Sequence, residues 1–269
     1  MTQVANLPET VSYSQLTTFL DCGERYELER VKRVTQTPAW WFLGGSAAHA
    51  TTEVWDAWHE GAAGLLNVDQ PDLEAVFAEK LNLEIAEADE SGVPRSQWFA
   101  GGRGKATEDF WLENGPVWVR YWADWRETSG WKLWNYLGDP AVEVPLVQHW
   151  SNGLKSRGFI DRVMYDTHGY LNIVDLKFGS TTPDSAAQLG LYAVGLEQEF
   201  GIRPQFGAFF MARKGKLLAQ EPLRKYTEPY FDRKFSGFDQ ARKAGIFLAN
   251  PGEKCSRCGV RGSCSEWRP

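Results

Sequence analysis

Apolar and polar positions in the first ninety residues follow the repeat of a helix. Leucine and phenylalanine recur at helical spacing after Ser12, which forms a capping-box pair with Gln15. A second helix is expected to begin after Gly44-Gly45-Ser46, where tryptophans and a valine form an apolar stripe. Residues 72–90 have the same periodicity. The N-terminal third of the chain is therefore predicted to be helical.

Tryptophan is concentrated between residues 98 and 134. Trp111, Trp118, Trp122 and Trp125 recur at spacings of seven, four and three, which places them on one face of a helix. One interpretation is that this face packs against the core. The other is that the rings form a platform on which bases of a single strand stack.

The period changes to two over residues 141–178, as is typical of strands. Val142 and Leu146 alternate with polar positions, and residues 158–166 and 170–178 predict two strands joined by a short turn. This segment is expected to form the centre of a sheet.

Helical and strand patterns then alternate to the end of the chain. A helix is predicted to open at Thr182-Pro183, with Pro at its first position, and to end near Phe200. Residues 205–212 and 216–223 predict a hairpin, and residues 229–248 predict a last helix. This order predicts an α/β (α+β) fold with a mixed central β-sheet flanked by helices.

Composition sets the class of protein. The 269 residues are 43% hydrophobic and 24% charged, as in ordinary globular proteins, and no apolar run approaches the roughly 20 residues of a membrane span. The first residues lack the basic start and apolar core of a secretion signal, so we expect a cytoplasmic protein without disulfides. A net charge of −6 disfavours non-specific coating of nucleic acid, but it is compatible with carboxylates gathered around a metal.

Two aspartates are predicted to face each other across the central hairpin. If residues 167–169 form a three-residue loop with Gly169 in the left-handed region, Asp161 lies opposite Asp175. Asp175 and Lys177 are two apart, so their side chains leave the same face. Opposed carboxylates destabilise a sheet unless a cation compensates, and Mg²⁺ or Mn²⁺ prefers oxygen ligands. The alternative is an exposed salt bridge between Asp175 and Lys177.

Three further polar residues are candidates for the same site. Gln188 and Tyr192 are four apart on the next predicted helix, and both side chains can hydrogen-bond to phosphate or to water. On its own, such a pair more often belongs to an ordinary helix surface. Glu143 either approaches the metal from the adjoining strand or is an exposed carboxylate at the sheet edge.

The chain has four cysteines, Cys22, Cys255, Cys258 and Cys264. The last three form Cys-x2-Cys-x5-Cys, and the use of every cysteine favours one site with four thiolates. Zinc is the competing occupant, although zinc sites generally prefer two short paired spacings. Unlinked buried cysteines are the remaining alternative.

Short motifs occur in an order that resembles the RecB-type branch of the PD-(D/E)XK nucleases. They are Gly45-Ser46-Ala47-Ala48-His49, Gly158-Phe159-Ile160-Asp161-Arg162, Asp175-Leu176-Lys177 and Gln188-Leu189-Gly190-Leu191-Tyr192. With one cysteine before these motifs and three after, the chain is similar to the iron–sulfur members, which include AddB-type, CRISPR-associated and phage exonucleases. Asp175 stands where many relatives have Glu, which shortens that ligand by one methylene.

The resemblance implies a restriction-endonuclease-like core in a single nuclease domain over residues 1–269. Its expected parts are N-terminal helices over 1–60, a helical tryptophan-rich insertion over 61–140, a catalytic sheet core over 141–225, and a C-terminal helix with a cluster-binding loop over 226–269. The resemblance also implies that Mg²⁺ or Mn²⁺ is ligated by His49, Asp161, Asp175 and the Leu176 carbonyl. Lys177 would orient or deprotonate the attacking water beside Gln188 and Tyr192, and the four cysteines would hold a [4Fe–4S] cluster.

The implied function is a DNA exonuclease acting on single-stranded DNA or DNA ends in recombination, repair or phage DNA metabolism. One alternative is an end-trimming nuclease of CRISPR adaptation that works with partner proteins. The other is an inactive single-stranded DNA-binding module, which would not need the full set of acids and lysine. The segment Gly101-Gly102-Arg103-Gly104-Lys105 lacks the spacing of a phosphate-binding Walker loop, so no motor activity is expected.

Overall fold

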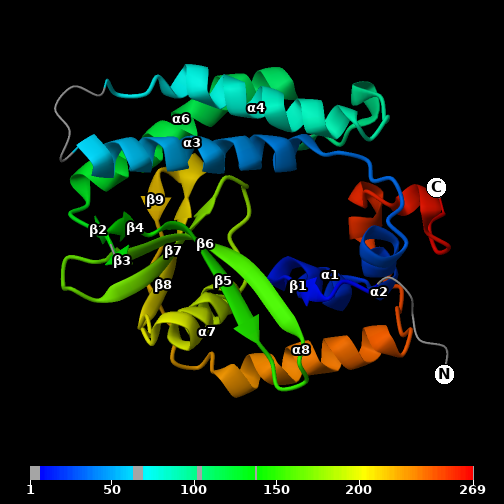
Figure 1. Ribbon diagram of the computed structural model, residues 1–269. Coiled ribbons are helices and arrows are strands. Elements are labelled where there is room, and N and C mark those ends of the chain that lie inside the picture. Colours follow the sequence, from blue (N-terminus) through cyan, green and yellow to red (C-terminus); the bar gives the residue numbers. More distant parts are fainter. Residues whose placement is uncertain (1–6, 63–68, 102–104, 137, 269) are drawn as a thin grey trace.

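The computed structural model describes four segments of the chain, residues 7–62, 69–101, 105–136 and 138–268. At their centre is one mixed β-sheet (Figure 1). Strand β6 (Lys155–Tyr165) pairs antiparallel with β5 (Val142–His149) and with β7 (Leu171–Lys177). Strand β8 (Phe206–Met211) runs parallel to β7. The predicted fold class, a mixed sheet flanked by helices, is confirmed.

Short strands extend the margins of this sheet. They are β1 (Thr10–Val11), β2 (Lys132–Leu133), β9 (Lys216–Leu217) and β10 (Glu221–Pro222). The first two pair with β6 and the last two with β8. The hairpin predicted after residue 205 is therefore present, with its second arm divided in two. A separate pair consists of β3 (Asn135–Tyr136) and β4 (Asp139–Pro140).

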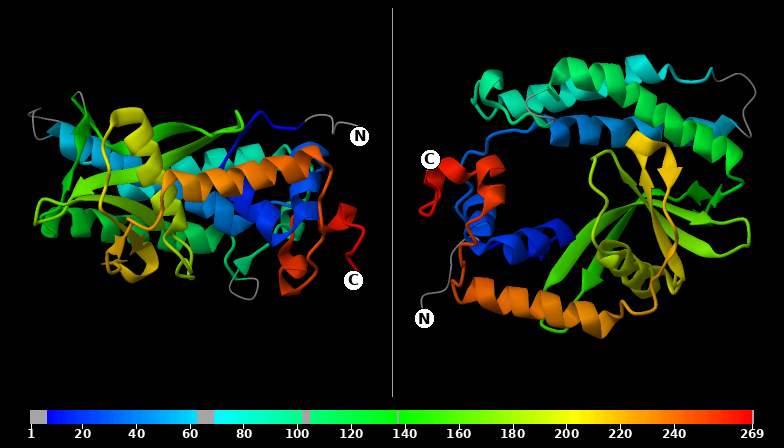
Figure 2. Two further views of the ribbon diagram at one scale, coloured as in Figure 1. Left: turned by 90° about the horizontal axis from the view of Figure 1, so that it is seen from below. Right: turned by 180° about the vertical axis from the view of Figure 1, so that it is seen from behind.

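Helices cover both faces of the sheet (Figures 1 and 2). The layer on one face contains α3 (Trp40–Ala62), α4 (Leu73–Asp89) and α6 (Glu108–Thr128), and α7 (Ala187–Phe200) covers the other face. The strands alternate between these layers: Ile173 of β7 packs in the core with α7, and its neighbour Val174 packs in the core with α3 and α6. Two separate cores therefore hold the sheet in place.

The remaining helices near the chain ends are α1 (Tyr13–Asp21), α2 (Gly23–Tyr26) with a π-helical turn (Glu27–Val31), and α8 (Glu228–Lys243), followed by 3-10 turns at Glu253–Arg257 and Arg261–Ser263. Two further 3-10 turns lie within the chain, at Arg95–Gln97 and Ala212–Lys214. No helix within the described segments is both long and apolar enough to cross a bilayer. Residues 102–104 of the glycine-rich segment lie outside the described residues.

The tryptophan face of α6 is part of the core. Trp111, Trp118 and Trp122 are 1%, 7% and 0% exposed, and Trp125 stacks on Trp122 with ring centroids 5.2 Å apart. A stacking platform needs accessible rings. The core interpretation is therefore correct, and these four residues do not form a platform for bases.

Three helix boundaries differ from the prediction. Helix α3 begins at Trp40 and includes the glycines expected to precede it; a Cβ on Gly44 would lie 1.9 Å from the ring of Trp111, so packing of α6 requires glycine there. Helix α7 begins at Ala187 rather than at Thr182-Pro183. Helix α8 ends at Lys243, because Gly245 turns the chain with φ +72°.

The cap of α1 is formed in part as predicted. The Ser12 hydroxyl accepts a hydrogen bond from the Gln15 backbone N–H at 3.2 Å. The Gln15 side-chain oxygen is buried and has no hydrogen-bond partner among the described residues, so it does not act as an acceptor in a reciprocal box. Only one half of the capping box is present.

The two ends of the chain lie against each other, with α2 beside the C-terminal segment (Figure 1). The Gly23 N–H donates to the Leu248 carbonyl at 2.8 Å, and the Lys254 ammonium lies 2.8 Å from Asp21. Glu24 accepts a hydrogen bond from the backbone N–H of Ser265 at 2.9 Å. Residues more than 220 positions apart in sequence are thus in direct contact.

Candidate functional site

Three acidic residues form a row across three neighbouring strands. The ladders pair Arg162 of β6 with a valine on β5 and with a valine on β7. The same registers set the neighbouring residue of β6, Asp161, opposite Glu143 of β5 and Asp175 of β7. Residues opposite each other on adjacent strands project from the same face, so this register brings three carboxylates together on one face of the sheet.

The turn between β6 and β7 sets this register. The Asp166 N–H donates to the Tyr170 carbonyl at 3.0 Å, and the three-residue loop between them contains Gly169 with φ +83°. This left-handed glycine closes the hairpin as the sequence predicts. The register that sets Asp161 against Asp175 is therefore present.

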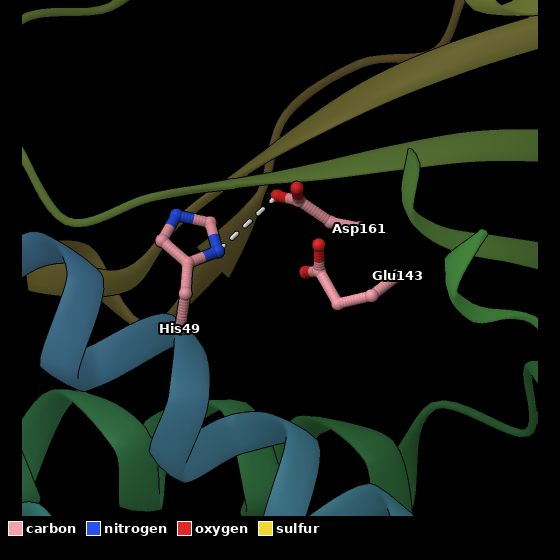
Figure 3. A group of neighbouring side chains, drawn as sticks. All are labelled: His49, Glu143 and Asp161. Carbon is pink, nitrogen blue, oxygen red and sulfur yellow. Dashed lines mark ion pairs between the residues drawn. The ribbon is translucent and has the colours of Figure 1, made fainter. Parts of the chain in front are cut away.

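His49 of α3 completes a compact group with two of the acids. One ligand atom from each of His49, Glu143 and Asp161 lies within 4.8 Å of the other two, and Figure 3 shows the three side chains pointing toward one another. His49 Nδ1 is 3.6 Å from an Asp161 oxygen. Burial lowers the pKa of His49 to about 4. The imidazole is therefore neutral at physiological pH, and a lone pair remains available to a metal.

Glu143 adopts an unusual backbone conformation. Its φ is +48°, in the left-handed region, although it lies within β5. The Oε1 atom is buried, is 3.5 Å from the Arg162 guanidinium, and accepts no hydrogen bond from the described residues. Burial, followed by the charge of Asp161, raises the pKa of Glu143 to about 7. Strain of this kind persists where the surrounding structure enforces it, often at functional sites.

The other two carboxylates are enclosed as well. Asp161 accepts a hydrogen bond from the Leu176 backbone N–H at 2.6 Å, and burial raises the pKa of Asp161. Burial and the nearby charge of Asp161 raise the pKa of Asp175 to about 6. Burial of all three acids, with the charge of Asp161 acting on the other two, thus favours their protonated forms. A divalent cation would favour the ionised forms instead.

Lys177 begins a chain of polar contacts that leads away from the acids. Its ammonium lies 2.6 Å from Asp175 and donates to Gln188 at 3.4 Å, and the Gln188 amide donates to the Tyr192 hydroxyl at 2.9 Å. Burial lowers the pKa of Lys177, but the Asp175 carboxylate outweighs this effect and the net pKa is above the ordinary value. Lys177 is therefore protonated at neutral pH.

Arg162 links α3 to the strand that carries Asp161. Its guanidinium is fully buried and donates to Asp56 at 2.6 Å, to the Asp161 carbonyl at 2.6 Å and to the Thr52 hydroxyl at 3.0 Å. Thr52 in turn donates to the His49 carbonyl at 2.7 Å. Arg162 thereby fixes the position of His49 relative to Asp161. Arg162 is not among the site residues predicted from the sequence, although its place between Asp161 and the apolar Val163 and Met164 is a signal for a buried charge.

A cavity of about 690 Å³ opens over this group of residues. His49, Glu143 and Asp161 line it together with Gln188 and Tyr192, both of which were predicted from the sequence to belong to the site. A small ligand or the end of a chain can therefore reach the acids from solvent.

The four cysteines gather where the chain ends meet. Cys22, Cys255 and Cys258 line one cavity of about 320 Å³, and Cys264 directly precedes Ser265, which bonds to Glu24 of α2. All four are free, half-buried thiols. Among the described residues, no three cysteine sulfurs lie within 4.8 Å of one another.

Comparison with known proteins identifies similar chains. A family model described as the PD-(D/E)XK nuclease superfamily matches residues 10–265. The gene 69 protein of Mycobacterium phage L5 is 28% identical over 98% of this chain and 99% of its own length, and that of Mycobacterium phage D29 is 30% identical over 94% and 95%. The crystal structure of SSO0001 aligns with a TM-score of 0.36 and 12% identity, covering 83% of this chain and 94% of that one.

Proposed function

Because this chain belongs to the PD-(D/E)XK nuclease superfamily, we propose that it is a metal-dependent deoxyribonuclease that acts as an exonuclease on single-stranded DNA or DNA ends. The observation that carries the proposal is the group formed by His49, Glu143 and Asp161, which lies next to the Asp175–Lys177 pair. Buried carboxylates this close together have little stabilising role of their own, and they provide ligands for a cation.

The proposed ligands are His49, Asp161, Asp175 and the Leu176 carbonyl, with Glu143 as a further carboxylate. Oxygen donors with one neutral imidazole suit Mg²⁺ or Mn²⁺. A bound divalent ion would supply charge stabilisation for the phosphate and lower the pKa of a water molecule. Glu143 has the features expected of a ligand, since its buried oxygen makes no hydrogen bond within the described segments.

The polar chain that begins at Lys177 would act on the substrate. Since Lys177 is protonated, its proposed role is to donate a hydrogen bond that orients the attacking water and offsets negative charge on the phosphate. Deprotonation of that water by Lys177 is disfavoured for the same reason. Gln188 and Tyr192 line the cavity and would hydrogen-bond to the phosphate.

The direct test is digestion of end-labelled DNA by the purified protein with magnesium or manganese. An exonuclease should shorten linear single strands, leave closed circular single strands intact, and stop when a chelator is added. Digestion of circles at the same rate would show endonuclease action. Equal digestion in excess chelator would contradict metal dependence.

Metal binding should depend on pH through the raised pKa values of the acids. A carboxyl whose pKa is raised by folding stabilises the metal-free folded protein at low pH, where the carboxyl is protonated. This stabilisation is lost as pH rises through the folded-state pKa, which is about 6 for Asp175 and about 7 for Glu143. His49, with its lowered pKa, acts in the opposite direction between about 4 and 6.5. Well above pH 7 these acids are ionised, and a metal displaces few protons from them. Below pH 6 it competes with protons.

Thermal unfolding with and without manganese measures this effect. At pH 8 and a manganese concentration about 100 times Kd, stabilisation should reach about 2.7 kcal/mol, and it should be clearly smaller at pH 5.5. Glu143→Gln, which cannot ionise, should flatten the difference. An equal manganese effect at both pH values would show that these carboxyls do not bind the ion.

We further propose that the four cysteines bind a [4Fe–4S] cluster. The Cys-x2-Cys-x5-Cys spacing with a distant fourth cysteine, and the cavity that Cys22 lines together with Cys255 and Cys258, support this proposal over a single zinc ion. Iron and sulfide analysis of anaerobically purified protein should give about four of each per chain. Cys258→Ser should lose most of the iron, whereas Ser256→Ala, two positions away, should retain it. One zinc per chain without iron would overturn the proposal.

The relatives support one of the proposed biological settings. Both gene 69 proteins belong to mycobacteriophages, which favours a cytoplasmic role in phage DNA replication, recombination or repair over a role beside CRISPR partner proteins. Retention of the acids and Lys177 favours an enzyme over an inactive DNA-binding module. The genes that neighbour this one would distinguish these settings.

A further inference from the structure

Two phenylalanine rings stand at the cavity that contains the acids. Phe42 is 62% exposed and Phe159 is 53% exposed, and both line that cavity. Single exposed apolar residues are common on protein surfaces. Two exposed rings from different elements that share one polar cavity are not explained by core packing.

On the strand side, Phe159 belongs to a regular series along β6. Arg157, Phe159 and Asp161 are each two residues apart, so their side chains project from one face at intervals of about 7 Å. All three line the cavity. The strand thus places a cation, an aromatic ring and a proposed metal ligand in sequence along one wall.

On the helix side, Phe42 stands in a similar relation to His49. These residues are seven apart on α3, which is about two turns along one face. Gly45 and Ser46 lie between them, and a Cβ on Gly45 would meet no atom within 4 Å. The helix therefore faces open space at Gly45, between the two residues in sequence.

The charges in the cavity do not attract a polyanion. Its described lining includes four carboxylates and only one basic side chain, that of Arg157; the acids are Glu53, Glu84, Glu143 and Asp161. Attraction of phosphates needs Lys and Arg, so the affinity for a DNA strand must come largely from another source. Stacking of bases on aromatic rings is such a source, and it is independent of charge.

We propose that Phe42 and Phe159 form a stacking site for unpaired bases of the strand whose phosphate reaches the acids. Base faces inside a duplex are covered by neighbouring bases, so only a single strand or a splayed end can stack on these rings. This inference rests on the proposed nuclease function and specifies its substrate: unpaired nucleotides adjacent to the scissile bond. It also places the stacking surface at the cavity rather than on the tryptophan helix.

Fluorescence anisotropy with labelled oligodeoxythymidylate tests the proposal, with calcium in place of magnesium to limit hydrolysis. Phe42→Ala and Phe159→Ala should each weaken binding of the single strand about tenfold or more. The dependence of binding on salt should remain as in the wild type, because no phosphate contact is lost. An abasic strand of equal length should bind the wild type weakly and show no further loss in the variants.

Tyr170→Ala is the matched control, because Tyr170 is 51% exposed but lies in the β6–β7 turn and does not line the cavity. It should bind like the wild type, and circular dichroism should show that all variants are folded. The stacking site would be overturned if both Phe variants bound the single strand as the wild type does, which is expected if the rings receive a protein partner instead. It would also be overturned if the wild-type protein did not bind the single strand.

Digestion of DNA with manganese is scored separately. Cleavage that does not depend on the rings refutes only the stacking site, and ring-dependent binding without cleavage refutes only the nuclease.

Discussion

Lys177→Ala should lower the rate of DNA hydrolysis by about 10²–10³-fold. The ammonium is 2.6 Å from Asp175 and is held in its charged form by that carboxylate, so it supplies a positive donor beside the proposed metal ligands. Removal of one donor that stabilises charge in the transition state usually costs an enzyme this much. Initial rates on end-labelled single strands at saturating manganese measure the effect.

A second lysine provides the control for this variant. Lys216 is exposed on β9, and Lys216→Ala should digest DNA at the wild-type rate. The affinity of the Lys177 variant for a single strand should stay within a few-fold of that of the wild type. The proposed role of Lys177 is to orient the attacking water, and it does not involve the stacking rings. A Lys177→Ala protein that digests DNA normally would remove this residue from the mechanism.

Asp56→Ala should lower the free energy of unfolding by about 3–5 kcal/mol. Asp56 is fully buried in α3 and accepts hydrogen bonds from Arg162 at 2.6 Å, from Arg126 at 2.9 Å and from Trp122 at 2.9 Å. Without this carboxylate, two buried guanidinium groups lose their main counter-charge. The cost comes from uncompensated charge rather than from the loss of packing volume.

Urea denaturation followed by tryptophan fluorescence gives this number. The control is Glu197→Ala, which removes a salt bridge to Arg203. The side chain of Glu197 is 55% exposed, so the urea midpoint of this variant should barely move. Asp56→Ala should also lower activity, because Arg162 holds His49 relative to Asp161. A variant as stable as the wild type would show that Glu60 and Glu143 suffice to neutralise the two arginines.

The hairpin that carries Asp161 and Asp175 could be predicted from the sequence because its geometry is local. A three-residue loop with Gly169 in the left-handed region determines which residues face each other, and simple counting then sets Asp161 against Asp175. The mixed sheet and most helices follow from periodicity in the same way. Short-range rules were sufficient for these features.

Features that depend on distant contacts could not be obtained this way. Helix α3 begins before Gly44. A glycine stands inside this helix because the ring of Trp111, 67 positions later in the sequence, packs against it. Spacing rules could not predict whether the Glu143 side chain reaches the other acids, because its positive φ departs from strand geometry. The buried pairing of Arg162 with Asp56 joins elements 106 residues apart.

The contact between the chain ends has a consequence for synthesis on the ribosome. Asp21 and Glu24 can contact their partners, Lys254 and Ser265, only after the segment that carries those partners has left the exit tunnel. Cys22 likewise meets Cys255 and Cys258, with which it lines a cavity, only at that stage. A nascent chain that already carries the complete row of acids would therefore still lack these contacts, so the segment around residues 248–265 would join α2 only after the central sheet has been synthesised.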